Sequence, residues 1–434
     1  MANPPCLYSY CTVYDNLKVR ILQDIQLLGA ANGRELPPDA QNVCACRRNT
    51  DSGPPSGSGR TRDMRNGQNV LILSCGTGDG HNRAAQAIGE ALEQRAIPHA
   101  FMNPIALYDQ KAGKWVDASY NRMIQHRPEA FNVLYRVGRI YGSRGRTSPV
   151  YSAIAHCATR LSDYIAANEF SAVICTHLFA MEAMTAVRKS KACDLPCFGL
   201  LTDYTCIPFT EETRMDGYFT PHADLTEELV GRGIPRDEIH PTGIPVSRRF
   251  SEHPGKAAAR QALRLPEDRP FLLVMGGGAG SGRMAQICRA LLQYPGKWLA
   301  AVMTGRNQSL FQALSRQFSA EPAIRLVPYT DEVSLCMAAA DVLVTKPGGL
   351  SSTEAAVTNL PLVHLLNYRA CEKSNVEFFA SRGMSLWARD EDGAASAAWR
   401  LLLDEPLRET MLVAQRKYTN PAAAEAIVES VVRS

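Results

Sequence analysis

The stretch Val70–Ile88, VLILSCGTGDGHNRAAQAI, decides the fold. Its first four residues are apolar and predict a buried strand, the run GTGDG predicts a tight turn, and the segment starting near Asn82 predicts a helix. A helix after such a turn directs its free N–H groups at the turn, where an anion can bind. A dinucleotide fingerprint would need a third glycine at position 81 and an acidic residue at the end of the next strand, but the chain has His81 and Asn103 there.

Beyond this stretch, short apolar runs alternate with helical segments, which is the pattern of parallel α/β sheets. A seam is expected at residues 242–246, and two sheets in one chain leave a cleft between their carboxyl edges, where open α/β sheets bind ligands. We therefore predict an α/β protein with two facing Rossmann-like domains. The predicted strands are 70–74, 172–176, 197–202, 217–220, 271–275, 298–303, 324–327, 341–345 and 361–366. Residues 1–66 are expected to be an extension that is either disordered or the product of a start codon assigned too early. An N-terminal domain (67–250), a C-terminal domain (251–404) and a final segment (405–434) are expected to follow.

The composition is that of a soluble globular protein, with 45% hydrophobic and 21% charged residues. The longest apolar runs fall short of the roughly 18 residues that cross a bilayer, and the N-terminus lacks a signal-peptide pattern. The 13 cysteines show no paired ligand spacing, so we predict reduced thiols in a cytoplasmic protein and no metal site.

Residues 111–146 hold eight basic residues against two acidic ones, with aromatic residues interleaved. This pattern fits the anionic surface of a membrane, although a solvated helix face or a nucleic-acid patch has the same composition. The residues that we expect to form the membrane patch are Lys114, Trp115, Arg122, Arg136 and Arg139.

Two further loops follow predicted strands. The loop 276–282 is rich in glycine and precedes a helix predicted at 283–292, a spacing that suits a phosphate. The second loop, residues 345–354, follows the strand predicted at 341–345. Its Lys346 supplies positive charge, and its Ser351 either caps the next helix or contacts a phosphate. Glu354 is expected on the first turn of that helix, where it either stabilises the helix end or accepts two ribose hydroxyls.

Two polar residues, His177 and Asp203, come just after the ends of predicted strands and should border the same cleft as His81. Either could orient His81 or contact a substrate, and a purely structural role is the alternative for both.

These motifs make residues 70–431 resemble the family-28 glycosyltransferases of the GT-B fold. Within that family the chain looks like the monogalactosyl- and processive glucosyl-diacylglycerol synthases. Seven stretches carry the resemblance, in consistent order: GTGDGH (76–81), CTHLF (175–179), LTDYTCI (201–207), PTGIPVSRRF (241–250), VMGGGAGSG (274–282), VTKPGGLSSTEA (344–355) and CEKSNVEFF (371–379).

The resemblance implies a peripheral-membrane enzyme on the cytoplasmic face that moves a hexose, with inversion, from a UDP-sugar to diacylglycerol. It implies that the N-terminal domain binds the lipid and the C-terminal domain the UDP-sugar, and that the segment after residue 405 crosses back to the N-terminal domain. It makes His81 the catalytic base, with Gly78 and Gly80 in the acceptor loop, Tyr329 at the uracil, Glu354 at the ribose, and Glu372 with Asn375 at the sugar and phosphates. The expected donor-binding residues also include Gly277, Gly278, Gly280, Lys346, Gly348, Gly349 and Ser351.

The chain departs from the family pattern at two positions, with Cys371 in place of a usual glutamine and Asp79 in place of a common glycine. A histidine suits proton transfer near neutral pH, and a helix N-terminus can stabilise a diphosphate leaving group, so no metal or other cofactor is expected. We expect no nucleic-acid partner. Three alternatives remain open: a GlcNAc transferase acting on a polyprenyl-diphosphate lipid, a UDP-GlcNAc 2-epimerase, and a UDP-sugar-binding regulator without catalytic activity.

Overall fold

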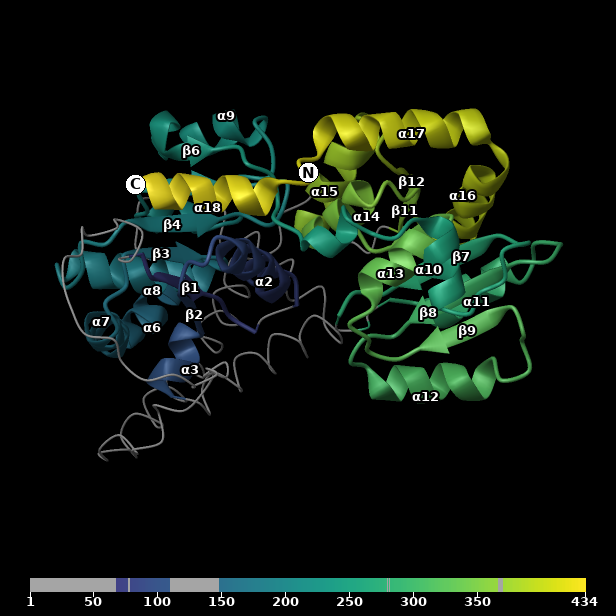
Figure 1. The fold of residues 1–434 in the computed structure, drawn as a ribbon, viewed down its shortest axis with the longest axis horizontal. Helices are drawn as coiled ribbons and strands as arrows, with labels where there is room; N and C mark the ends of the chain where they lie inside the picture. The colour runs from purple at the N-terminus through teal and green to yellow at the C-terminus, as the bar shows by residue number, and fades with distance from the viewer. Residues whose placement is uncertain (1–67, 77–78, 110–147, 279, 281, 366–369) are drawn as a thin grey trace, which may run out of the picture. The chain divides into compact units, whose positions relative to one another are not determined.

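The computed structural model describes residues 68–76, 79–109, 148–278, 280, 282–365 and 370–434, and residues 69–434 form one compact unit. The predicted extension, residues 1–66, lies outside the described residues. Figure 1 shows two α/β halves, each built around a parallel sheet of six strands.

The first half holds a sheet with the strand order β2-β1-β3-β4-β5-β6. Each neighbouring pair is parallel, and Val70 lies opposite both His99 and Ala172. Its strands are β1 (Val70–Leu73), β2 (His99–Met102), β3 (Ala172–Cys175), β4 (Cys197–Leu200), β5 (Gly217–Phe219) and β6 (Ile239–His240). Its helices are α2 (Asp79–Gln94), α3 (Pro104–Tyr108), α6 (Pro149–Ile154), α7 (Ala158–Ala167), α8 (Leu178–Lys189) and α9 (Leu225–Val230), with 3-10 turns η2 (Ala155–Cys157), η3 (Thr210–Glu212) and η4 (Arg236–Glu238).

The second half holds a sheet with the order β12-β11-β10-β7-β8-β9, again with every pair parallel. Its strands are β7 (Phe271–Met275), β8 (Leu299–Met303), β9 (Ile324–Val327), β10 (Val342–Thr345), β11 (Leu362–Leu365) and β12 (Leu386–Ala388). Its helices are α10 (Lys256–Ala262), α11 (Met284–Leu291), α12 (Gln308–Gln317), α13 (Val333–Ala339), α14 (Gly349–Val357), α15 (Ala370–Ser381), α16 (Glu391–Leu403) and α17 (Glu405–Tyr418), with the 3-10 turn η5 (Arg248–Phe250). The final helix, α18 (Ala423–Arg433), lies over the first half (Figure 1).

Each sheet is buried on both faces because parallel strands are connected by helices that cover them. Strand β1 (VLIL) and strand β7 (FLLVM) are buried along their whole length, as their unbroken apolar sequences predict. The predicted two-domain Rossmann-like fold is therefore confirmed. All nine strands for which bounds were predicted exist within two residues of those bounds, strand β2 was expected only as the strand that ends before Asn103, and the short edge strands β6 and β12 were not predicted.

The last segment of the chain forms two helices, α17 and α18, separated at residues 419–422 by a stretch that includes Pro421. Helix α18 packs against α2 of the first half (Figure 1), and its buried residues are Ala423, Ala424, Ile427, Val428 and Val431. The Asn420 side chain also donates a hydrogen bond of 2.8 Å to the Thr242 carbonyl oxygen. The C-terminus is thereby fixed to the domain that holds the N-terminal sheet.

None of the helices within the described residues combines the length and the apolar character needed to cross a bilayer.

Helix α8 carries a carboxyl group in the core of the first half. Glu182 has no exposed surface, and neither of its carboxyl oxygens has a hydrogen-bond partner among the described residues. Burial, followed by the nearby Glu212, raises the pKa of Glu182 well above its ordinary value, while Lys189 acts in the opposite direction. This carboxyl group costs stability, because a buried polar group without a partner loses its hydration and gains nothing in return.

Replacing this residue, Glu182→Met, is expected to stabilise the protein by about 1–3 kcal/mol, measured by urea unfolding at pH 8. A carboxyl group whose pKa is raised in the folded state favours folding at low pH, and stability falls as the pH rises above the unfolded value of 4.5. The gain should therefore be larger at pH 8 than at pH 4.5. The exposed Glu409→Met on α17 serves as the control and should change little. An equal or smaller gain at pH 8 would contradict this account.

Candidate active site

Helix α2 begins at Asp79, three residues before the predicted start, so His81 lies within its first turn rather than in the preceding loop. The Nδ1 atom of His81 is 2.8 Å from the carbonyl oxygen of Thr176, which follows β3, and 3.1 Å from the hydroxyl of Thr202, which follows β4. A carbonyl oxygen only accepts, so we assign the ring hydrogen to Nδ1. The neutral ring then keeps the lone pair of Nε2 for accepting a proton.

The other two predicted catalytic residues lie close to His81. His177 is the N-cap of α8, and its Nδ1 accepts a hydrogen bond from the backbone N–H of Phe179. The two histidine rings meet edge to face with centroids 4.5 Å apart. The structure thus brings the two predicted histidines together. It also shows that His177 has a structural role, because its side chain caps helix α8.

Burial disfavours the charged form of both histidines. Burial lowers the pKa of His81, and the Asp203 carboxylate and the bond to Thr176 oppose this effect. Burial and then the neighbouring His81 lower the pKa of His177 well below its ordinary value. His81 is the one of the pair with a carboxylate that favours its charged form, as a general base requires.

A small cavity adjoins this histidine pair. It is mostly apolar, and besides the three predicted catalytic residues its lining consists of Thr176, Leu178, Met181, Leu200, Leu201, Thr202, Thr205 and Ile207. The cavity has a volume of about 10 Å³, which is the space of about one water molecule, so it can hold a single small group such as a hydroxyl beside the histidines.

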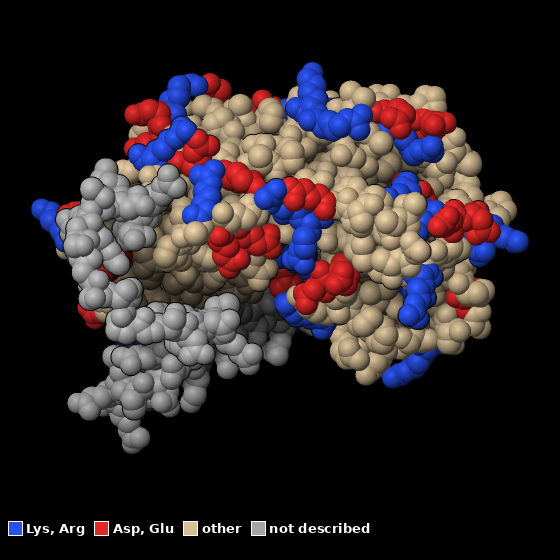
Figure 2. All heavy atoms as spheres, viewed as in Figure 1, with Lys and Arg blue, Asp and Glu red and all other residues tan. Residues whose placement is uncertain are grey.

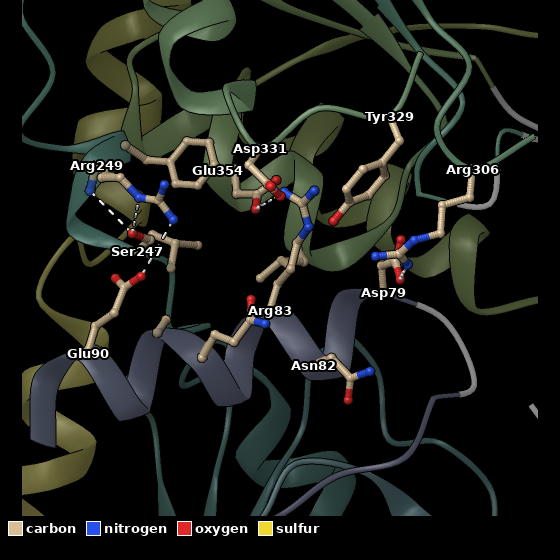
Figure 3. A pocket seen from close by; sticks show the side chains of 15 residues that line it. Asp79, Asn82, Arg83, Glu90, Ser247, Arg249, Arg306, Tyr329, Asp331 and Glu354 are labelled. Atoms are coloured by element: carbon tan, nitrogen blue, oxygen red, sulfur yellow. Dashed lines mark hydrogen bonds and ion pairs between the residues drawn. The ribbon is translucent and has the colours of Figure 1, made fainter. Parts of the chain in front are cut away.

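A second pocket, of about 190 Å³, lies between α2 of the first half and loops of the second half (Figure 3). Glu354 is buried in its wall, and Arg83 extends from α2 toward it, with Nη1 and Oε1 3.7 Å apart. Burial raises the pKa of Glu354 to about 7, with Arg83 acting in the opposite direction. Glu354 lies on the second turn of α14, not the first as predicted, because the helix begins at Gly349.

Helix α14 begins at the last glycine of the Pro-Gly-Gly stretch, residues 347–349. Its N-cap is Gly348, which makes no side-chain cap, so the capping alternative for Ser351, now the third helical residue, is wrong. Gly349 is buried against the first half: a Cβ at this position would lie 1.9 Å from the carbonyl oxygen of Thr202. Only glycine permits this approach of α14 to the loop that follows β4.

The predicted glycine loop lies between β7 and α11 and contains residues with left-handed backbone. Gly277 and Gly280 have positive φ values of 72° and 60°. The Lys346 side chain lies beside Gly277, where an added Cβ would be 2.7 Å from its Cε. Lys346 also pairs with the buried Glu372 of α15, with Nζ and Oε1 3.8 Å apart. Cationic and backbone donors thus gather where β7 and β10 end.

Asn375 of α15, which was predicted at the sugar and phosphates, makes hydrogen bonds with three groups of the protein. Its amide oxygen accepts a bond of 2.8 Å from the backbone N–H of Tyr204. Its NH₂ group donates to Asp203 Oδ1 at 2.8 Å and to the Pro347 carbonyl oxygen at 2.9 Å. Both hydrogens are therefore used, and Asn375 connects the second half to the loop that carries Asp203.

Tyr329 follows β9 and is 39% exposed, with the guanidinium of Arg306 lying over its ring at 4.3 Å from the centroid. Sequence reasoning missed Arg306 and Arg83, which both line the pocket. Arg306 follows β8 within TGRN, and its place after a strand's carboxyl end was the available signal. Figure 3 shows Arg249, Ser247 and Glu90 at the other end of the pocket.

Several predicted residues cannot be placed. Gly78 lies outside the described residues, while Gly80 lies in the first turn of α2. The five residues of the predicted membrane patch also lie outside them. Over the described part of the face in Figure 2, basic and acidic side chains are mixed. Cys371 lies on α15.

Among the described residues, no three His, Cys, Asp or Glu side chains are grouped so that they could hold a metal ion.

Comparisons with known proteins agree with this geometry. Residues 81–246 match the family model of monogalactosyldiacylglycerol (MGDG) synthase. The processive diacylglycerol beta-glucosyltransferase of Bacillus cereus (strain B4264) is 23% identical over 378 residues, covering 84% of this chain and 93% of the relative. The enzyme of the same name from Staphylococcus carnosus (strain TM300) is 24% identical and covers 77% and 85% of the two chains.

Solved structures show the same fold. MurG of Acinetobacter baumannii matches with a TM-score of 0.55 at 16% identity, covering 85% of this chain and all of the other. The S. aureus MnaA–UDP structure matches with a TM-score of 0.57 at 14% identity, covering 84% and 96%. The two parallel sheets and these solved structures show that the chain has the two-domain GT-B fold, and the MGDG synthase model match over residues 81–246 and the curated relatives show that it is similar to glycosyltransferases that make glycolipids.

Proposed function

We propose that the enzyme transfers a hexose from a UDP-sugar to diacylglycerol, with inversion at the sugar, to form a glycolipid. The observation that carries the proposal is the His81 site. A histidine of fixed tautomer lines a small cavity at the carboxyl ends of β3 and β4. The names of the family model and of the curated relatives support a glycolipid product and a diacylglycerol acceptor.

In this proposal His81 removes the proton from the lipid hydroxyl as that oxygen attacks the anomeric carbon. The bond from Nδ1–H to the Thr176 carbonyl oxygen fixes the ring, so Nε2 is the atom that accepts the proton. Asp203 stabilises the imidazolium that forms, because its carboxylate favours the charged ring. Asn375 holds Asp203 in place and acts as a positioning residue.

The donor would occupy the second half. Glu354 would accept hydrogen bonds from the ribose hydroxyls, and the backbone beside Tyr329 would hold the uracil. The diphosphate would lie along the loop containing Gly277, Gly278 and Gly280, where Lys346 and the backbone N–H groups stabilise the leaving charge. We propose that these groups perform this role without a metal ion.

We also propose that the enzyme works on the cytoplasmic face of a membrane, bound to anionic lipids. The support is the sequence of residues 111–146, whose basic and aromatic side chains suit an anionic lipid surface. A diacylglycerol acceptor stays in the bilayer, so an enzyme that uses it must reach the membrane surface.

Donor binding is expected to release protons near neutral pH. The pKa of Glu354 is about 7 in the free protein, and ribose hydroxyls that donate to its carboxylate would lower it. At pH 7 the binding of UDP-glucose, whose diphosphate has no group that titrates near this pH, should therefore release about half a proton. Affinity should rise between pH 6 and pH 8.

Calorimetric titrations of UDP-glucose in two buffers of different ionisation enthalpy measure this release. The matched variant Glu354→Gln cannot release a proton, and its binding enthalpy should be the same in both buffers. A wild-type binding enthalpy that does not depend on the buffer would contradict the assignment of Glu354 to the ribose.

The transfer itself is tested with the full chain, anionic vesicles containing diacylglycerol, EDTA, and labelled UDP-glucose, UDP-galactose or UDP-GlcNAc. We expect label from one hexose donor to enter the organic phase. Vesicles without diacylglycerol are the matched control, and neutral vesicles should give a lower rate. Bound UDP without transfer from any donor would contradict the proposal and favour a regulator, and GlcNAc transfer to a polyprenyl lipid alone would favour that alternative.

A further inference from the structure

An ion pair connects the two halves at one end of the pocket in Figure 3. Asp79, the first residue of α2, places Oδ1 2.6 Å from Nη1 of Arg306, which lies in the loop between β8 and α12. Arg306 is held on two further sides. Its guanidinium lies over the ring of Tyr329, and its backbone N–H donates to the carbonyl oxygen of Gly278 at 2.9 Å.

The other carboxyl oxygen of Asp79 lies against the glycine loop after β7. This oxygen, Oδ2, is buried and has no hydrogen-bond partner among the described residues. A Cβ added to Gly278 would lie 1.7 Å from it, so the carboxylate covers the position above the Gly278 backbone. On the neighbouring residue, Gly277, the side chain of Lys346 lies in the corresponding position. The loop therefore has a cation beside one glycine and an anion–cation pair beside the next.

We propose that Asp79 is an internal competitor of the donor's diphosphate, and that Arg306 is the cation for which the two compete. The inference rests on the proposed function, which places the diphosphate along this loop. A carboxylate and a phosphate are both acceptors with negative charge, so they cannot occupy the same place above Gly278 at once. Asp79 must leave Arg306 before the diphosphate binds.

The contacts on both sides of the pair explain why the exchange is feasible. The Arg306 side chain is 59% exposed, and ion pairs that remain in contact with water contribute little to stability. Among the described residues, the buried Oδ2 of Asp79 has no hydrogen-bond partner, so the ion pair with Arg306 gives this oxygen no bond that replaces its hydration. A diphosphate offers Arg306 more acceptor oxygens and more charge than one carboxylate does. The donor therefore displaces Asp79, and Asp79 lowers the donor affinity.

The experiment measures the affinity of the full chain for UDP and for uridine by calorimetry at low salt. The variant Asp79→Asn keeps the shape of the side chain and removes its charge. We expect UDP to bind about 1.5- to fivefold more tightly to this variant, the gain that corresponds to the loss of a partly exposed charge pair. Uridine has no phosphate, so its affinity should not change.

Two further variants make the result specific. Asp224→Asn breaks another ion pair between the two halves, with Arg382, at a place that does not line the pocket, and should leave UDP affinity unchanged. Arg306→Gln should weaken UDP binding, and in this background Asp79→Asn should no longer tighten it. This loss of the gain is the signature of competition for Arg306.

Unchanged or weaker UDP binding by Asp79→Asn would overturn the inference. An equal gain for uridine would also overturn it, because Asp79 would then act by holding the halves together rather than by occupying the phosphate position. A wild-type chain that binds no UDP at all would contradict the proposed function itself, and the inference would fail with it.

Discussion

Replacing His81 by alanine is expected to reduce kcat by a factor of about 10²–10⁴ while leaving UDP affinity unchanged. The His81 ring lines the small cavity, and the Thr176 carbonyl oxygen fixes its Nδ1–H. Its Nε2 is therefore left to take the proton from the lipid hydroxyl. Its removal takes away proton transfer but none of the groups assigned to the donor. Initial rates of label transfer to lipid, with UDP binding measured on the same preparations, separate these effects.

The control for this prediction is another histidine. His156 is exposed, and its Nδ1 contacts backbone carbonyl oxygens of its own helical segment, so His156→Ala should transfer sugar at the wild-type rate. The pH profile gives a second readout. Activity should fall as the pH drops through the pKa of His81, which burial places below the ordinary value. A His81→Ala variant that retains wild-type kcat would remove this residue from the mechanism.

Adding one methyl group, Gly349→Ala, is expected to cost about 1–3 kcal/mol of stability, because overpacking a tight contact forces the backbone to move. The new Cβ would lie 1.9 Å from the Thr202 carbonyl oxygen and 3.3 Å from the Cα of Asp203. The loop that must move therefore carries both the hydroxyl beside His81 and the carboxylate that supports it. A displacement near 1 Å of such groups should lower kcat by about 10²-fold.

The adjacent residue provides the matched control. A Cβ at Gly348 would meet nothing within 4 Å, and the backbone there is extended, with φ of −78°. Gly348→Ala should change the free energy of unfolding by less than about 1 kcal/mol. Urea unfolding of the two variants makes the comparison. Equal effects of both substitutions would mean that the contact between α14 and Thr202 does not determine the position of the loop.

The alternation of apolar runs and helical stretches was sufficient to predict two parallel sheets, because strands buried on both faces leave an unbroken apolar signature. Strands such as β1 and β7 were found within one residue of their predicted bounds. The two-residue strand β6 and the half-exposed β12 carry too weak a signature to be predicted. Helix starts were less accurate, and α2 begins at Asp79, three residues before its predicted start.

Within the candidate site, the sequence predicted which residues stand at the carboxyl ends of strands, and the structure brings His81 and His177 together there. It could not predict side-chain partners across the chain. Asn375 bonds to Tyr204 across 171 residues of sequence, and Arg306 pairs with Asp79 across 227. Such pairs depend on how the two halves pack, and no local pattern encodes them.

The most direct test of the central claim is the configuration of the sugar in the lipid product. A single displacement, in which the lipid oxygen activated by His81 attacks an α-linked UDP-hexose, must give a β-linked sugar. Proton NMR of the purified glycolipid measures this through the coupling of the anomeric proton. The account predicts the large coupling of a β-glucoside or β-galactoside, and a small coupling, which marks an α-linked product, would contradict it.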